Sequence, residues 1–312
     1  YKFISIMTLN VFLIFNSLSF AKAFNLGQVV SNTTNVMGLG TKFHLPQGEW
    51  TVAGIKSLNG GVRPVDTILI QTEGRNIKAI LNIRFARDQG PTQGWDAVGG
   101  WKPIEHYENN NCDDYGGQRS NFHQVNIDKK KQSLIIEGSC LAIFARNDFV
   151  KLNEIATSTS ILEAFEIADN YIKSKNLNYP EALVVVGSTY FTEDNQVHTY
   201  YMANPTHSNI ISNPRVSYSD SEWNSYNINN YDDKKAYMVN AISIGRNVKN
   251  IIASNFKYKK TLDLRPYDKI VSFNKSSSNS APTKKNNAIT RLKKLKGMFE
   301  DGLITQKQYE QK

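Results

Sequence analysis

The residues best suited to chemistry fall in one stretch, 88–122, between two runs that predict strands. This stretch carries Trp95, Trp101, Tyr107 and Tyr115 among Gly, Asn and Asp. A connection of this length without regular secondary structure is typical of a functional loop. Aromatic rings beside amides and carboxylates suit a polar, flat-faced ligand such as a glycan, or a protein partner. These four aromatics are our candidate binding residues; an insertion that only covers a sheet face is the alternative.

Two cysteines, Cys112 in the same stretch and Cys140 in a predicted strand, are the candidates for covalent chemistry. The acidic neighbours of Cys112, in CDDY, favour the thiol over the nucleophilic thiolate. In an oxidising compartment we therefore predict a Cys112–Cys140 disulfide. Closing a loop of about 28 residues should stabilise the fold by about 3.6 kcal/mol on the chain-entropy model. A nucleophilic Cys112 with His123 as its base is the alternative.

Motifs of the common enzyme classes are absent from the sequence. It contains no G-x-S-x-G, no H-E-x-x-H, no P-loop and no G-x-G-x-x-G that opens a helix. The histidines, none of which has metal-ligand spacing on a predicted helix, are His44, His106, His123, His198 and His207. We therefore predict no metal and no cofactor, and we assign no catalytic residue. A metal held by CDDY with His106 or His123 is the alternative.

The start of the sequence has the parts of a secretory signal peptide. Lys2 precedes an apolar run, and Ala21 and Ala23 form an A-x-A cleavage pattern. We predict a signal peptide over residues 1–23, cleavage near Ala23, and export to the periplasm or the extracellular space. Because no Met begins the sequence, we expect a few residues upstream. An inner-membrane anchor through residues 3–20 is the alternative.

The net charge of +9 is unevenly distributed along the chain. Residues 284–312 carry eight basic and three acidic side chains, whereas residues 24–283 carry 27 basic and 25 acidic ones. A nearly neutral body lacks the basic footprint that binding to a phosphate backbone needs. We therefore expect no nucleic-acid partner.

The hydrophobic pattern of residues 24–273 predicts one α+β domain. Residues 48–57 read as a first strand, and strand-like pairs flank three turns, at 73–76, 129–131 and 193–195. Helical periodicity marks two helices, one from about residue 161 and one over about 233–255. Consecutive hairpins imply an antiparallel sheet with two packed helices. Residues 203–232 are predicted to be mostly loop, and residues 255–264 to run out toward a linker.

Finer features of the two helices can also be predicted. Ser160 and Glu163 match the S-x-x-E capping box, so we expect the first helix to begin near residue 161. The apolar face predicted for the second helix consists of Ala236, Val239, Ile242, Val248, Ile251 and Ile252.

The last 39 residues predict a tether followed by a small helical hairpin. Residues 274–287 are rich in Ser, Asn and Lys without apolar periodicity, as in a flexible linker. Residues 288–312 carry an apolar stripe, a Gly302 stop after Asp301, and a second helix that begins at Thr305. The residues predicted to form its association surface are Ile289, Leu292, Leu295, Phe299, Leu303, Ile304 and Tyr309.

This hairpin resembles the SHOCT family, a short C-terminal domain found at the ends of many unrelated bacterial proteins. The resemblance rests on the spacing of Leu292 and Leu295, on DGLIT at 301–305, and on Tyr309 with Lys312 after it. It implies a role in oligomerisation or interaction, with no catalysis attached. The second helix of the family normally continues for several more residues, so we expect sequence beyond Lys312.

The hairpin is too small to fold on its own, because short isolated helices are marginal in water. We therefore expect it to dock on another copy, on its own domain or on an envelope protein. Contact with a membrane surface is less favoured, because the Asp301–Gly302 stop interrupts a continuous amphipathic face. The sequence thus predicts a non-enzymatic binding and assembly protein of the cell envelope. The alternative is an envelope hydrolase or glycan-binding enzyme that uses the 88–122 loop.

Overall fold

The computed structural model describes residues 24–35, 41–57, 65–87, 122–132, 135–147, 149, 151–154, 159–192, 195–213, 216–257 and 261–273. The strands are β1 (Val29–Asn35), β2 (Lys42–Ser57), β3 (Val65–Glu73), β4 (Asn76–Arg87), β5 (Phe122–Gln132), β6 (Ile135–Arg146), β7 (Leu183–Thr192), β8 (Asn195–Ala203) and β9 (Leu262–Asp263). The α-helices are α2 (Thr159–Ser174), α3 (Asp232–Lys257) and α4 (Asp268–Val271).

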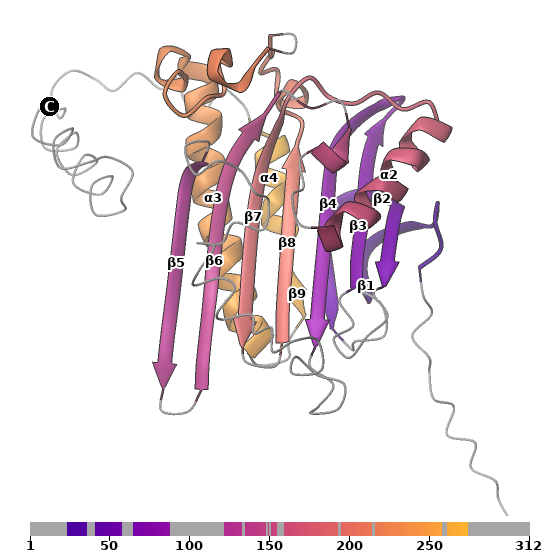
Figure 1. Ribbon diagram of the computed structural model, residues 1–312, viewed down its shortest axis with the longest axis vertical. Coiled ribbons are helices and arrows are strands. Elements are labelled where there is room, and N and C mark those ends of the chain that lie inside the picture. Colours follow the sequence, from indigo (N-terminus) through magenta and orange to yellow (C-terminus); the bar gives the residue numbers. More distant parts are fainter. Residues whose placement is uncertain are drawn as a thin grey trace, which may run out of the picture.

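The strands form one nine-stranded sheet, shown in Figure 1. The order of the strands is β1-β2-β3-β4-β8-β7-β6-β5. Each strand in this order is antiparallel to its neighbours. The short strand β9 pairs with β2 in parallel. The predicted α+β class, an antiparallel sheet of hairpins with packed helices, is therefore confirmed.

Two of the three predicted hairpin turns are confirmed. Strands β3 and β4 are joined through Gly74, which has a φ of +59° that favours glycine, and β7 is followed directly by β8. The third predicted hairpin is formed by β5 and β6, but its turn was placed wrongly at 129–131, because Lys129–Lys131 lie within β5 and the strand runs on to Gln132. Among the described residues β5 pairs with β6 alone, and lysines are well suited to such an edge strand.

The predicted first strand proves to be part of a longer one. Residues 48–57 form the second part of β2, and β1 precedes it. Both Trp50 and Val52 are fully buried, as predicted from their alternation, and Ile55 is half-buried. The first predicted helix begins at Thr159, which places Ser160 inside the helix rather than at its cap.

Helices α2 and α3 cover opposite faces of the sheet (Figure 1). Alternate residues of β4 show this directly: Leu81 packs in the cluster on the α3 side, and Ile80 packs in the cluster on the α2 side. On the α2 side, Glu163 forms an ion pair with Lys56 of β2. Two hydrophobic layers therefore sandwich the sheet.

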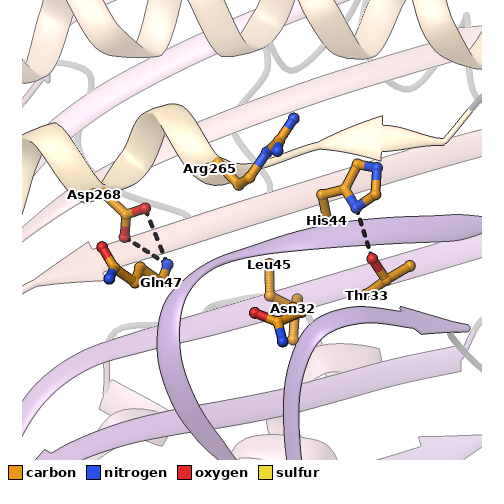
Figure 2. Close-up of a pocket in the computed structure, with 7 residues that line it drawn as sticks. All are labelled: Asn32, Thr33, His44, Leu45, Gln47, Arg265 and Asp268. Carbon is orange, nitrogen blue, oxygen red and sulfur yellow. Dashed lines mark hydrogen bonds between the residues drawn. The ribbon is translucent and has the colours of Figure 1, made fainter.

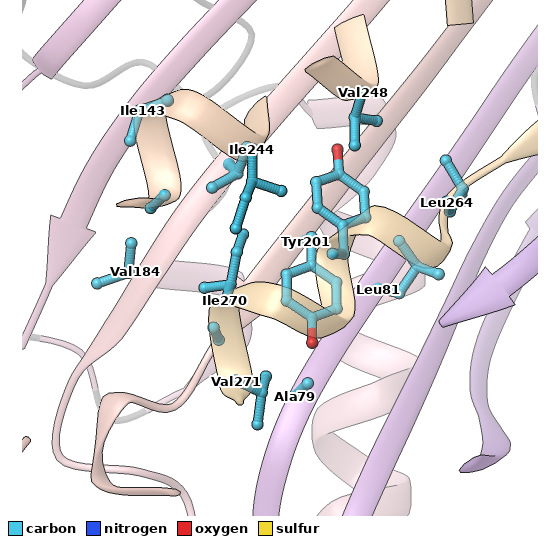
Figure 3. Close-up of a cluster of buried hydrophobic side chains, with 14 of the residues drawn as sticks. Ala79, Leu81, Ile143, Val184, Tyr201, Ile244, Val248, Leu264, Ile270 and Val271 are labelled. Atoms are coloured by element: carbon cyan, nitrogen blue, oxygen red, sulfur yellow. The ribbon is translucent and has the colours of Figure 1, made fainter. Parts of the chain in front are cut away.

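The larger core lies between α3, α4 and the sheet, as Figure 3 shows. Gly245 lets α3 approach closely, because a Cβ atom there would lie 2.8 Å from Cγ1 of Val186. The predicted apolar face of α3 is correct for Ile242, Val248 and Ile252 but wrong for Val239, whose side chain is 47% exposed. Tyr237 and Met238 lie on the buried face of the helix instead.

Residues after α3 return to the core instead of running out toward a linker, which corrects the prediction for 255–264. Leu262 and Leu264 are fully buried beside β2 and the sheet core. The ring of Tyr267 stacks on that of Tyr201 at 4.7 Å between centroids. These apolar residues are too few to form a periodic pattern. Only their burial in the structure identifies them as part of the core.

None of the helices within the described ranges is long and apolar enough to cross a membrane.

Candidate functional site

Most of the site residues predicted from the sequence lie outside the described residues. This applies to the candidate binding residues Trp95, Trp101, Tyr107 and Tyr115 and to Cys112. It also applies to the association residues Ile289, Leu292, Leu295, Phe299, Leu303, Ile304 and Tyr309. The roles assigned to them stay predictions.

Cys140 is the one predicted site residue that the structure describes. It lies in β6, paired with Ile127 of β5 and Thr189 of β7, and its side chain is 2% exposed. The disulfide to Cys112 stays a prediction. Such a bridge would attach to the sheet at β6, the strand between β5 and β7.

A pocket of about 420 Å³ opens beside the β1–β2 edge of the sheet (Figure 2). Its lining residues are Asn32, Thr33, His44, Leu45, Gln47, Arg265 and Asp268. Two parts of the chain that are far apart in sequence meet here, because the backbone N–H of Leu264 donates to the carbonyl of His44 at 2.9 Å. The pocket is therefore built by the C-terminal return described above.

The β1–β2 side of the pocket supplies a hydroxyl and an imidazole. The register pairs Thr33 with His44, and Oγ1 of Thr33 lies 2.7 Å from Nδ1 of His44. A register shift between Ser31 and Thr33, with Asn32 at a φ of +57°, bends β1 at this point. This contact leaves Nε2 as the ring nitrogen that a ligand could reach.

The C-terminal side of the pocket supplies a carboxylate. Both carboxylate oxygens of Asp268 accept a hydrogen bond from the backbone N–H of Gln47, at 2.8 and 2.9 Å. Burial raises the pKa of Asp268 above its usual value, and the bond from Gln47 opposes that shift. Asp268 therefore ties α4 to β2 at Gln47, three residues before Trp50.

A guanidinium completes the pocket. Arg265 is 61% exposed at its side chain, and it donates through Nε and Nη2 to the two carboxylate oxygens of Asp263, both at 2.8 Å. These bonds hold the pKa of Asp263 below its usual value. Asp263 is not among the lining residues, so Asp268 is the single carboxylate on the pocket wall within the described ranges.

A second concentration of polar groups is buried in the sheet itself. The register places Asp66, Arg84, His198 and Thr189 in one row across β3, β4, β8 and β7. Nε of Arg84 lies 3.7 Å from Oδ2 of Asp66, and Oγ1 of Thr189 lies 3.1 Å from Nδ1 of His198. All four residues are less than 9% exposed.

The sequence holds a signal for this row. Polar residues recur at every second position of β4, as Asn82 and Arg84, and of β8, as Gln196 and His198. Such a polar face on otherwise apolar strands is the signal. Because a slip of one residue would move these charges into the α3 core, the row fixes strand register.

Within the described ranges, no three His, Cys, Asp or Glu side chains lie together as metal ligands would. The pocket offers one hydroxyl, one imidazole, one guanidinium, amides and a single carboxylate. Such groups can orient a small polar ligand by hydrogen bonds.

No protein family model matches the chain, and neither the curated proteins nor the solved structures contain a match. A function must therefore be inferred from the residues of this chain.

Proposed function

We propose that this chain is a non-enzymatic binding and assembly protein of the cell envelope. In this proposal residues 1–23 direct export, residues 24–273 form the binding domain, and residues 288–312 attach the protein to an envelope protein or to another copy. No cofactor and no nucleic acid take part.

The observation that carries the binding role is that the ionisable groups around the pocket are held by partners within the fold. Asp268 accepts from Gln47, Asp263 pairs with Arg265, and His44 contacts Thr33. A group that transfers protons must reach the reacting atoms with a free lone pair or proton. Because both carboxylates are engaged in this way, they serve better to recognise a ligand than to transform it, and Nε2 of His44 is left to hydrogen-bond that ligand.

The proposed ligand at the pocket is small, polar and rich in hydroxyl or carbonyl groups. A volume of about 420 Å³ accommodates a ligand of that kind, and the exposed amides of Asn32 and Gln47 both donate and accept hydrogen bonds. A sugar unit of an envelope glycan has this chemistry. The same class was predicted for the aromatic residues of 88–122.

The assembly role is tested in cells. A photoreactive amino acid replaces Lys294, which lies beside the predicted stripe, and the exported protein is cross-linked in place. We expect an adduct heavier than the single chain, because the stripe needs a second surface to bury it. The adduct should disappear in L292D/L295D, which charges the stripe, and persist in the matched control K293A/K296A.

Two results would count against the assembly role. One is that no adduct forms in exported protein, and the other is that L292D/L295D gives the same adducts as the wild type. The mass of the adduct distinguishes a second copy, at twice the chain mass of 35.3 kDa before cleavage, from an envelope protein.

A further inference from the structure

Exposed large apolar side chains gather on one end of the domain. Within the described residues, five of the seven that are at least about one-third exposed come from residues 211–239. They are Ile211, Val216, Tyr226, Tyr231 and Val239, called here the end patch. Their segment runs from β8 to the first turns of α3, and it lies over the beginning of α3 in Figure 1.

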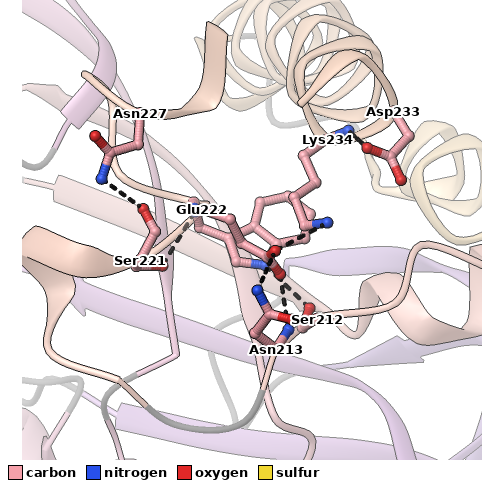
Figure 4. Close-up of polar contacts among 8 residues, drawn as sticks. Ser212, Asn213, Ser221, Glu222, Asn227, Asp233 and Lys234 are labelled. Atoms are coloured by element: carbon pink, nitrogen blue, oxygen red, sulfur yellow. Dashed lines mark hydrogen bonds and ion pairs between the residues drawn. The ribbon is translucent and has the colours of Figure 1, made fainter. Parts of the chain in front are cut away.

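The end patch stands on a rigid base. Nζ of Lys234 lies 3.2 Å from Oε2 of Glu222, and the two side chains are 7% and 4% exposed. The backbone N–H and the side-chain amide of Asn213 also donate to Glu222, at 2.8 and 2.9 Å (Figure 4). An ion pair this deeply buried is stable only with such additional hydrogen bonds. It locks the segment that carries Ile211 onto α3.

The chain is also held near both tyrosines of the end patch. The backbone N–H of Tyr226 donates to Oδ1 of Asn224 at 2.8 Å, and the ring of Tyr231 lies 5.3 Å from Nζ of Lys234. Tyr226 is nevertheless 76% exposed and Ile211 is 75% exposed. Because the backbone beneath these side chains is held in place, binding costs little backbone entropy, which favours a docking surface.

The described chain ends beside this surface. The ring of Phe273 packs against that of Tyr237 at 5.5 Å between centroids, and Tyr237 lies two residues before Val239 in α3. On the other side, Oγ of Ser208 donates to the carbonyl of Val271 at 2.6 Å. The last described residues therefore contact the buried side of the first turns of α3 and the segment just before Ile211.

The tether is long enough to return the hairpin to this surface. Residues 274–287 number 14, so they span about 46 Å when fully extended and about 20 Å on average as a flexible chain. A flexible link of this length gives an effective concentration on the order of 1 mM at its own domain. A second copy reaches that concentration only in very concentrated solution.

Charge favours the same contact. Residues 204–235 carry four acidic and three basic side chains, and the carboxylates of Asp220 and Asp232 are exposed. Residues 288–312 carry six basic and three acidic side chains, with Lys293, Lys294 and Lys296 beside the stripe. Opposite net charges orient the two surfaces toward each other.

From these observations we infer that residues 288–312 dock on the end patch of their own chain. This goes beyond the proposed function, and rests on it only in taking the hairpin as a docking element. The hairpin then has a resting place on the domain, and an envelope partner binds by displacing it.

Hydrogen exchange followed by mass spectrometry tests this inference on the chain from residue 24 to residue 312. With a docking constant of about 0.1 mM, the effective concentration above gives about tenfold slower exchange in residues 289–300 than in an undocked hairpin. The I211D/Y226D variant should lose that protection, and so should L292D/L295D. The matched control L26D/V29D charges two other exposed apolar side chains, 53% and 56% exposed, outside the end patch and should keep that protection.

Four results decide the outcome. Loss of protection in I211D/Y226D but not in L26D/V29D, at every protein concentration, supports the inference. Protection that survives in I211D/Y226D, or hairpin amides that exchange at the unprotected rate in the wild type, overturns it. Protection that grows with concentration assigns the site to a second copy and also overturns it. Circular dichroism confirms that each variant is folded, and cross-linking at Lys294 tests assembly independently.

Discussion

Lys234 of α3 and Glu222 of the segment before it form an ion pair of 3.2 Å with almost no solvent access to either side chain. The same ammonium lies 5.9 Å from the ring of Trp223 and 5.3 Å from that of Tyr231. Trp223 itself is fully buried, and its indole N–H donates to Oγ of Ser212 at 3.0 Å. A segment with little regular secondary structure is thus held by charge and by aromatic packing.

The Lys234–Glu222 pair makes the first prediction. Lys234→Met leaves the Glu222 carboxylate buried without its cation, so we expect unfolding free energy to fall by about 3–5 kcal/mol in urea titrations. The double variant E222Q/K234M removes both charges and should be less destabilised than K234M alone. The neighbouring exposed lysine provides the control, and Lys235→Met should change stability by less than about 0.5 kcal/mol. Equal losses in K234M and K235M would contradict the role of the pair.

Gly245 makes the second prediction. A Cβ atom there would lie 2.8 Å from Val186, 3.0 Å from Leu141 and 3.1 Å from Ile143, so Gly245→Ala overpacks the contact between α3 and the sheet. We expect a loss of about 1–3 kcal/mol, although alanine favours the helix itself. Ser243→Ala, at an exposed position of the same helix, should be neutral within about 0.5 kcal/mol. A Gly245→Ala variant as stable as the wild type would show that α3 can move away at no cost.

Asp263 and Asp268 make the third prediction, because their pKa values shift in opposite directions. The pKa of Asp263 is lowered by Arg265, so its contribution is present above the unfolded pKa, near 3.9, and is lost as pH falls through the folded pKa. Asp263→Asn should therefore cost stability near neutral pH and little in strong acid. Urea titrations from about pH 7 to about pH 2.5 measure this difference.

Asp268 provides the control of opposite sign. Burial raises its pKa, so its contribution is present below the unfolded pKa and is lost as pH rises through the folded pKa. The unfolding free energy of Asp268→Asn should therefore increase relative to that of the wild type as pH rises through that window. The amide oxygen of the variant still accepts from Gln47. The opposite pKa shifts would be contradicted if the difference in unfolding free energy from the wild type changed with pH in the same direction for both variants.

The predicted Cys112–Cys140 bridge makes the fourth prediction. We expect Cys140→Ser and Cys112→Ser each to lower the unfolding free energy by about 3.6 kcal/mol in protein folded under oxidising conditions. The double variant should lose no more than either single one, because one bridge is broken in every case. Alkylation in denaturant without reductant should label no thiol in the wild type. Two labelled thiols per denatured chain would disprove the bridge.

The sequence predicted those parts of the fold whose burial follows a regular period. Leu81 and Ile80 alternate between two cores, and Ile242, Val248 and Ile252 recur along one helical face, so the strands and helices could be located. Lys129–Lys131 were misplaced because a basic triplet is typical both of a turn and of an edge strand.

The candidate site was harder to predict because it depends on contacts between distant segments. His44 and Arg265 line one pocket although 220 residues separate them in the sequence. The polar segment 203–232 was predicted to be loop, and nothing in its composition shows that Trp223 is buried while Tyr226 is exposed. Trp223 packs against Tyr237 of α3 and donates to Ser212, and these contacts appear only in three dimensions.

The return of the chain through β9 and α4 also constrains how the protein can fold. Leu262, Tyr267 and Ile270 fill the core on β2 and its neighbours, so the earliest strands of the domain lack their packing partners until the last ones have been synthesised. The β2–β9 pairing closes a loop of more than 200 residues, and the entropy cost of closing it precedes the favourable contacts. Completion of the native core therefore waits until residues 262–271 have left the ribosome, and before that point the strands that they cover lack part of their packing.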